Sequence, residues 1–281
     1  MKISVSGLLG GHSGDDINKN RGNANKILNS FLTSVSKKYN IGLAVFNGGN
    51  LRNAIAREAF TVITVPSSKK ENLVAEFNIF SATVKTGFEQ NEPGLKLKIE
   101  SVEMPAYIVD DVTKQNLILA LNDCPHGVLG MSARMEGMVE TSTNLASVKF
   151  IDNNKIRVTT SQRSEIEIRK HQAAKMVETV FKLAGAEVVH SDGYPGWEPN
   201  PDSKVLKTVV ESYHKLFGVQ PVVRSIHAGL ECGLFLEKYP ELEMVSFGPT
   251  IYGAHSPDER LNIETTQKFW KHLVDVLESL K

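Results

Sequence analysis

The sequence contains only two cysteines in 281 residues, Cys124 and Cys232, which lie far apart and in no Cys-x-x-Cys pattern. This scarcity excludes a disulfide-rich secreted scaffold and favours two reduced, buried thiols in a reducing cytosol. No apolar run reaches the roughly 18 residues that a membrane-spanning helix needs. The segment Met1–Val5 has the pattern of a strand and not of a signal peptide. We therefore expect a cytoplasmic protein without a membrane partner.

An excess of charge is also missing, because 32 basic residues balance 32 acidic ones. This balance excludes a generic attraction to nucleic acid. Several common catalytic motifs are absent as well, namely HExxH, the P-loop, GxSxG and a GxGxxG that opens a helix. What the sequence does have is 41% hydrophobic residues, enough to bury a core, in a chain longer than one typical domain. Two domains are therefore expected.

Residues 1–190 are predicted to form an α+β domain. The expected elements are a strand at 3–9, a helix at 20–39, a strand at 54–65, a helix at 70–85, a strand at 95–102, a helix at 111–121, a hairpin of 137–150 with 155–162, a helix at 164–185 and a short strand at 186–189. Similar strings begin the two halves, at Ser13–Ile17 and Ile108–Val112. They favour an internal duplication, with a fortuitous match as the alternative.

Residues 191–281 follow a different pattern. Turn-forming residues crowd Gly193–Pro201, which places a domain boundary near there. Beyond it we expect helices at 203–217, 230–238 and 264–280 and strands at 222–226 and 242–247. Such alternation predicts a parallel or mixed sheet with helical cover. Two or three strands are too few to complete such a sheet, so we expect the rest of it, and the segment before the abrupt N-terminal strand, to come from outside this chain.

Two histidines in loops are candidates for chemistry. His12 stands in a Gly-Gly-His-Ser-Gly turn, where an accessible imidazole can stabilise developing charge on a substrate; the alternative is a histidine that only caps the following helix. His255 follows the predicted strand at 242–247. Loops at that end of a strand hold ligands in α/β enzymes, and a neutral imidazole there suits zinc. The alternative is a histidine in an ordinary surface loop.

Five further residues are candidates for substrate binding. Asn144 lies on a predicted strand and Arg163 lies where the next strand meets a helix, a placement that could clamp a carboxylate. His227, Gly229 and Glu231 lie in Ile226–Gly233, where a glycine-containing loop could bring small residues close to a ligand. For this segment a helix N-terminus with Glu231 in its first turn is an equally good interpretation.

Together these motifs resemble the aminoacyl-histidine dipeptidases, also called Xaa-His dipeptidases or bacterial carnosinases, of metallopeptidase family M20. The resemblance covers essentially the whole chain. The matching strings lie at residues 10–26 (GGHSGDDI with RGNANK), 193–197 (GYPGW), 226–235 (IHAGLECGLF) and 246–259 (SFGPTIYGAHSPDE). The last two strings separate this subfamily from M20 enzymes in general.

The resemblance implies a two-zinc catalytic domain interrupted by a lid. Residues 1–190 would be a duplicated α+β lid, and residues 191–281 the C-terminal portion of a zinc-peptidase α/β sandwich. His12 would stabilise the tetrahedral intermediate and His255 would bind zinc. Asn144 and Arg163 would hold the substrate's C-terminal carboxylate, while the loop with His227, Gly229 and Glu231 would lie beside the metals.

The resemblance also implies what this chain does not carry. The family's other zinc ligands and its glutamate base belong upstream of residue 1, and one imidazole cannot hold a zinc pair. We therefore expect this chain alone to be inactive, and its partners to be an N-terminal catalytic half, a dipeptide ending in histidine and, as an open possibility, a second copy. Manganese or cobalt could replace zinc.

Two rival hypotheses remain. The first is a non-catalytic oligomerisation or regulatory module derived from such an enzyme. The second is a single-zinc hydrolase that uses His227, Glu231 and His255, although no general base of comparable quality accompanies them.

Overall fold

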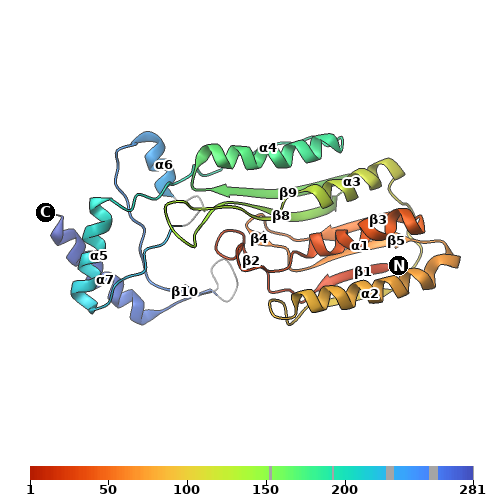
Figure 1. The fold of residues 1–281 in the computed structure, drawn as a ribbon, viewed down its shortest axis with the longest axis horizontal. Helices are drawn as coiled ribbons and strands as arrows, with labels where there is room; N and C mark the ends of the chain where they lie inside the picture. Colours follow the sequence, from red (N-terminus) through yellow and green to blue (C-terminus); the bar gives the residue numbers. More distant parts are fainter. Residues whose placement is uncertain (152–153, 192, 226–230, 253–258, 281) are drawn as a thin grey trace. The chain divides into compact units, whose positions relative to one another are not determined.

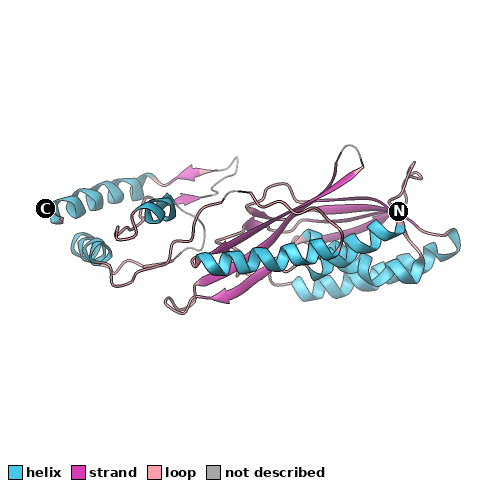
Figure 2. Ribbon diagram, turned by 90° about the horizontal axis from the view of Figure 1, so that it is seen from above, coloured by secondary structure: helices cyan, strands magenta, loops and turns pink. Residues whose placement is uncertain are grey.

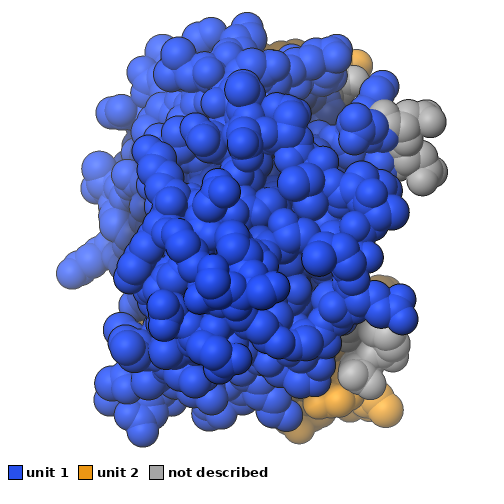
Figure 3. Space-filling model, turned by 90° about the vertical axis from the view of Figure 1, so that its right-hand side faces the viewer, with its two compact units in different colours: residues 1–196, 226–229 blue, residues 197–225, 230–281 orange. Residues whose placement is uncertain are grey.

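The structure is a computed structural model and describes residues 1–151, 154–191, 193–225, 231–252 and 259–280. Contacts divide the chain into two compact units, which Figure 3 colours separately. The first contains Met1–Gly196 with Ile226–Gly229, and the second contains Trp197–Ser225 with Leu230–Lys281. This division falls a few residues beyond the boundary expected at residue 190.

Unit 1 is built on a seven-stranded sheet in which every pair is antiparallel. Its strands are β1 (Lys2–Ser6), β3 (Gly42–Gly48), β5 (Ala59–Thr64), β6 (Lys96–Glu100), β7 (Gly127–Met131), β8 (Val139–Ile151) and β9 (Lys155–Ser164). The order is β6-β1-β5-β3-β8-β7, with β9 also paired to β8. The long strand β8 joins the two halves of the unit, because β3 pairs with it near Val148 and β7 pairs with it from Val139 to Thr143.

Four helices form a layer along this sheet, in the contact order α2-α1-α3-α4 (Figures 1 and 2). They are α1 (Ala24–Tyr39), α2 (Lys70–Phe88), preceded by the 3-10 turn Ser67–Lys69, α3 (Asp111–Asp123) and α4 (Glu167–Leu183). Helix α1 lies centrally, since its apolar residues recur every three or four positions and bury one face. Phe31 from α1 packs with Phe46 from β3 and Leu145 from β8 in the same core.

The two halves of unit 1 share a helix, two neighbouring strands and a helix. In the first half these are α1, β3, β5 and α2, and in the second half they are α3, β8, β9 and α4. The short strand predicted at 186–189, at the end of the second half, is not found, because Ala186–Val189 forms no strand in the described chain. A strand is stable only with a ladder partner, and these residues pair with no strand there.

Unit 2 contains α5 (Lys204–Phe217), α6 (Glu231–Lys238), α7 (Ile263–Ser279) and the short antiparallel pair β10 (Ile251–Tyr252) and β11 (Arg260–Leu261). Helices α5 and α7 pack together around His272, whose Nε2 lies 2.8 Å from the carbonyl oxygen of Val209. Large apolar side chains remain on its surface, with Val222 and Ile263 77% exposed and Trp270 64% exposed.

The parallel or mixed sheet expected in this unit is not found among its described residues. Positions 222–225 and 242–247 lie outside any strand. The prediction of strands at 222–226 and 242–247 was therefore wrong for these positions, and residue 226 lies outside the described part. The physical reason is the same as at Ala186–Val189. Their apolar, β-branched composition favours an extended backbone, but no described segment supplies the neighbouring strand that would complete a ladder.

Candidate functional site

His12 lies on a loop that leaves the end of β1 and returns at the start of α1. Its backbone forms β2 (Gly11–His12), which pairs with β4 (Ala54–Ile55). The glycine pair before it is required by geometry. Gly10 and Gly11 have φ angles of +64° and +135°, and a Cβ on Gly11 would lie 2.1 Å from Nη1 of Arg21. Only glycine fits such a positive φ and such a close approach.

The imidazole of His12 is oriented by its own loop. Its Nδ1 accepts hydrogen bonds from the backbone N–H groups of Gly14 and Asp15, each at 3.3 Å. A nitrogen that accepts in this way carries no proton in the neutral ring, so the proton lies on Nε2. The carboxylate of Asp15 is 3.6 Å from Nδ1. The loop therefore presents His12 as a hydrogen-bond donor through Nε2.

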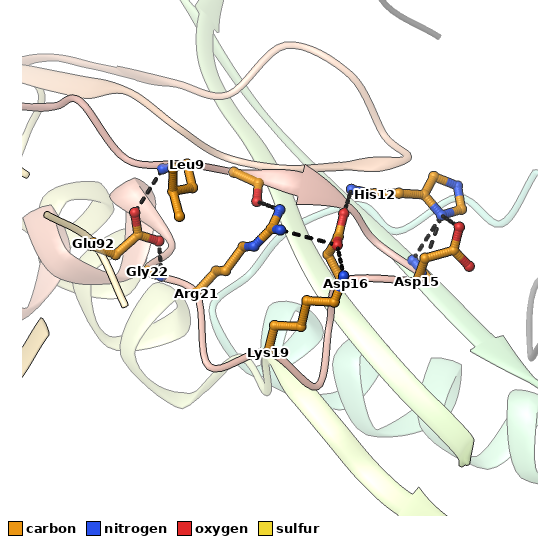
Figure 4. Close-up of polar contacts among 10 residues, drawn as sticks. Leu9, His12, Asp15, Asp16, Lys19, Arg21, Gly22 and Glu92 are labelled. Atoms are coloured by element: carbon orange, nitrogen blue, oxygen red, sulfur yellow. Dashed lines mark hydrogen bonds and ion pairs between the residues drawn. The ribbon is translucent and has the colours of Figure 1, made fainter. Parts of the chain in front are cut away.

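A partly buried charge pair, Asp16 with Arg21, holds the backbone of His12. Oδ2 of Asp16 accepts from the His12 N–H at 2.8 Å, while Oδ1 lies 3.2 Å from the Arg21 guanidinium and 2.7 Å from Nζ of Lys19. Arg21 also donates to the carbonyl oxygen of Gly10. Figure 4 shows these contacts. Burial raises the pKa of Asp16, but hydrogen bonds from Lys19 and His12 together with the Arg21 charge hold that pKa below its usual value. The carboxylate is thus ionised at neutral pH.

Arg163, at the end of β9, meets the same loop. Its Nε donates to Oγ of Ser13 at 3.2 Å, so the residue next to His12 touches the guanidinium. Burial lowers the pKa of Arg163, the charge of Asp15 raises it and the charge of Arg52 lowers it. The guanidinium stays charged at any physiological pH. The structure therefore brings the His12 loop, Arg163 and Arg52 into one neighbourhood of positive and hydrogen-bonding groups.

Asn144 supports this arrangement from β8. Its side chain is 1% exposed, and Nδ2 donates to the carbonyl oxygens of Ala54 at 2.8 Å and Arg52 at 3.4 Å. Because Leu145 packs in the helix-side core and side chains alternate along a strand, Asn144 points to the opposite face. Its contacts hold β4, the partner of β2, in place. Direct contact of Asn144 with a substrate stays a prediction.

The other predicted site residues lie in the second part of the chain. Glu231 is exposed in the first turn of α6, which matches the alternative interpretation of that segment. His227, Gly229 and His255 lie outside the described residues. Within the ranges that the structure describes, no three His, Cys, Asp or Glu side chains form a group that could hold a metal ion.

Sequence reasoning overlooked the residues that hold His12 and Arg163. Asp16 and Arg21 carried a signal, since opposite charges five positions apart on one short loop can pair across it. Ser13 and Arg52 carried none, because their proximity to Arg163 depends on where β4 and β9 meet in the folded sheet.

The fold agrees with comparisons to known proteins. The family model of peptidase family M20/M25/M40 matches residues 9–279, and the chain belongs to that family. It is 40% identical over 280 residues to the cytosol non-specific dipeptidase of Escherichia coli (strain K12), covering 100% of this chain and 58% of that protein. It also matches the crystal structure of aminoacylhistidine dipeptidase from Vibrio alginolyticus, with a TM-score of 0.88 and 42% identity over 99% of this chain and 56% of that one.

The chain therefore spans a little more than half the length of these two relatives. Both are dipeptidases by name, which agrees with a hydrolase of this family. No helix in the described part of the chain is both long enough and apolar enough to pass through a membrane.

Proposed function

We propose that this chain is the lid-bearing part of a metal-dependent dipeptidase of the cytosol that cleaves dipeptides with a C-terminal histidine. The observation that carries the proposal is the His12 loop in contact with Arg163 through Ser13, in a chain that matches M20 dipeptidases along its whole length. Unit 1 would be the lid, and unit 2 would complete the catalytic domain. One relative is named for aminoacylhistidine and the other as non-specific, which supports tolerance before the histidine.

In this proposal His12 and Arg163 divide the substrate between them. The Nε2–H of His12 donates to the oxygen of the scissile carbonyl, where negative charge develops in the transition state. Arg163 binds the C-terminal carboxylate, because a guanidinium matches the two oxygens of a carboxylate. Its Nε bond to Ser13 fixes the plane of the guanidinium relative to the histidine. Asn144 supports both residues indirectly, because it holds β4, the partner of β2. The segment with His227, Gly229 and Glu231 would also contact the substrate.

We propose zinc as the metal, with His255 as one ligand and manganese or cobalt as possible replacements. The chain spans 58% of the E. coli relative, and we propose that most of the metal ligands belong to the part that it does not match. No step is assigned to the metal. Unit 2 has large apolar side chains that a further part of the enzyme could cover, since Phe235, Ile263 and Trp270 are each more than half exposed. The same exposed side chains would serve a non-catalytic module, which is the second candidate function.

The test is a hydrolysis assay with β-alanyl-histidine and alanyl-alanine, with added zinc. The chain is assayed alone and joined to the N-terminal part of the E. coli relative that it does not match. We expect no turnover from the chain alone and turnover from the joined protein. There His12→Ala should lower kcat about 100- to 1000-fold, the loss typical of one oxyanion donor. Arg163→Lys should mainly raise KM.

His190→Ala is the matched control, because His190 is an exposed histidine of unit 1 that pairs with Glu178. It should leave both constants unchanged. Turnover by the unjoined chain would refute the need for further residues. A joined protein that folds and binds zinc but hydrolyses neither dipeptide would refute the enzymatic proposal and favour the non-catalytic module.

A further inference from the structure

The loop that carries His12 closes on one buried carboxylate far away in the sequence. Glu92 is 2% exposed and lies in the turn between α2 and β6. One of its oxygens accepts from the N–H of Leu9 at 2.7 Å, and the other accepts from the N–H of Gly22 at 2.8 Å. These two groups mark the beginning and the end of the His12 loop (Figure 4). A single side chain therefore fixes the distance between the two ends of the loop.

This contact is built into the fold. The N–H of Glu92 donates to the carbonyl oxygen of Phe88 at 2.8 Å, which fixes the turn to the end of α2. The backbone of this turn also approaches the end of β1 closely, at Gly94 and Gly7. A Cβ on Gly7 would lie 2.0 Å from the carbonyl oxygen of Gly94. Burying a carboxylate is unfavourable unless strong donors bind it. Two backbone N–H groups, one on each oxygen, are the donors among the described residues.

The ends of the loop are connected to His12 by further polar contacts. Arg21 stands next to Gly22 and donates to the carbonyl oxygen of Gly10, the residue after Leu9. Its guanidinium pairs with Asp16, and Asp16 accepts from the N–H of His12. A shift of either end of the loop would therefore move Arg21, Asp16 and the histidine backbone together.

We propose that Glu92 is a positioning residue that places His12 for the dipeptidase reaction. The proposal rests on the proposed function and adds a residue that touches neither substrate nor metal. A displacement of about 1 Å in a catalytic group can cost on the order of 100-fold in rate. Loss of one of the two Glu92 bonds should thus lower kcat more than it raises KM, because His12 lies on the loop itself, whereas Arg163 lies on β9 and meets the loop through Ser13.

The test uses Glu92→Gln, which keeps the size of the side chain but replaces one acceptor oxygen by an NH₂ group. In the joined protein, kcat should fall about 10- to 100-fold. The decisive measurement is the same substitution in a His12→Ala background. There it should cause no further loss, because the group that Glu92 positions is gone. Glu100→Gln is the control, since Glu100 is a charged neighbour of Lys98 on β6, and it should leave kcat unchanged.

A second readout needs no activity. In the chain alone with ¹⁵N-labelled histidine, Glu92→Gln should shift the ring-nitrogen resonances of His12 and leave those of His126 unchanged, which shows that the unit is folded. If the glutamine variant does not fold, Glu92→Asp is measured in the same way. Equal losses of kcat with and without His12, or an unchanged His12 resonance, would overturn the proposal. If the joined parent protein hydrolyses nothing, the proposed function fails, and the His12 resonance alone decides the role of Glu92.

Discussion

Two histidines of unit 1 are oriented by the same kind of hydrogen bond, but the consequences for the two residues differ. In both, Nδ1 accepts from backbone N–H groups: His12 from its own loop and His126 from Leu145 at 3.3 Å. The proton of each neutral ring therefore lies on Nε2. His12 stands on a polar loop beside Asp15 and near Arg163, whereas burial, together with the nearby Lys26 charge, lowers the pKa of His126 to about 4. The surroundings of His12 suit a role in catalysis, whereas those of His126 make the stability of the protein depend on pH.

His126 should make the protein less stable in weak acid. Its folded pKa lies below the ordinary value of 6.5, so the unfolded chain binds the proton more readily between these two values. Stability is therefore complete above pH 6.5 and is lost as the pH falls towards 4, by roughly 3 kcal/mol in total from this group. Urea unfolding of the parent and of His126→Asn should show this difference, because an asparagine oxygen can accept from Leu145 without titrating. Parallel loss of stability in both proteins from pH 7 to pH 4.5 would contradict it.

At the scale of the elements, one lysine connects two helices. Nζ of Lys26, on the first turns of α1, donates to the carbonyl oxygens of Leu121, Asn122 and Cys124 at 2.8–2.9 Å, where α3 ends. A cation at a helix C-terminus is favourable, because the last carbonyl groups have no partner within the helix. Burial lowers the pKa of Lys26, while Cys124 and Asp123 act in the opposite direction.

Lys26→Met should therefore destabilise unit 1 by about 2 kcal/mol, since three carbonyl groups lose a charged donor. Lys37→Met is the matched control, because Lys37 is an exposed lysine on the same helix. Its effect should stay within about 0.5 kcal/mol. Chemical denaturation measures both free energies of unfolding. Equal effects of the two substitutions would show that the contact with α3 contributes nothing.

The residue pattern within each helix or strand explains which elements could be predicted from the sequence. Helix α1 was predictable, since its apolar residues recur at helical spacing over several turns. Strand β3 was overlooked because most of Gly42–Gly48 is buried, so no alternation of polar and apolar residues marks it. Strand β7 was overlooked because Gly127 and Gly130 weaken its pattern. In the site, the glycine turn pointed to His12, whereas nothing near Glu92 in the sequence indicates its bonds to Leu9 and Gly22.

At the scale of the whole molecule, the two units differ in how well they bury their own apolar residues. The sheet and helix layer of unit 1 enclose a continuous core that contains Phe31, Phe46 and Leu145, each fully buried. In unit 2 the fully or nearly buried apolar side chains among the described residues are few, namely Val209 and Val276 at 6% and 4% exposure. A unit with so little buried surface gains little hydrophobic stabilisation against its loss of chain entropy.

Residues 1–196 alone should therefore fold, and residues 197–281 alone should not form a well-packed domain. We expect one cooperative urea transition for the first fragment, and for the second a weak, broad transition with strong binding of the dye ANS, because Val222, Ile263 and Trp270 expose large apolar surfaces. Joining the second fragment to the part of the E. coli relative that this chain does not match should abolish the dye binding if that part covers these side chains. A sharp transition of residues 197–281 alone, without dye binding, would show that unit 2 is stable by itself and that its exposed apolar residues need no partner.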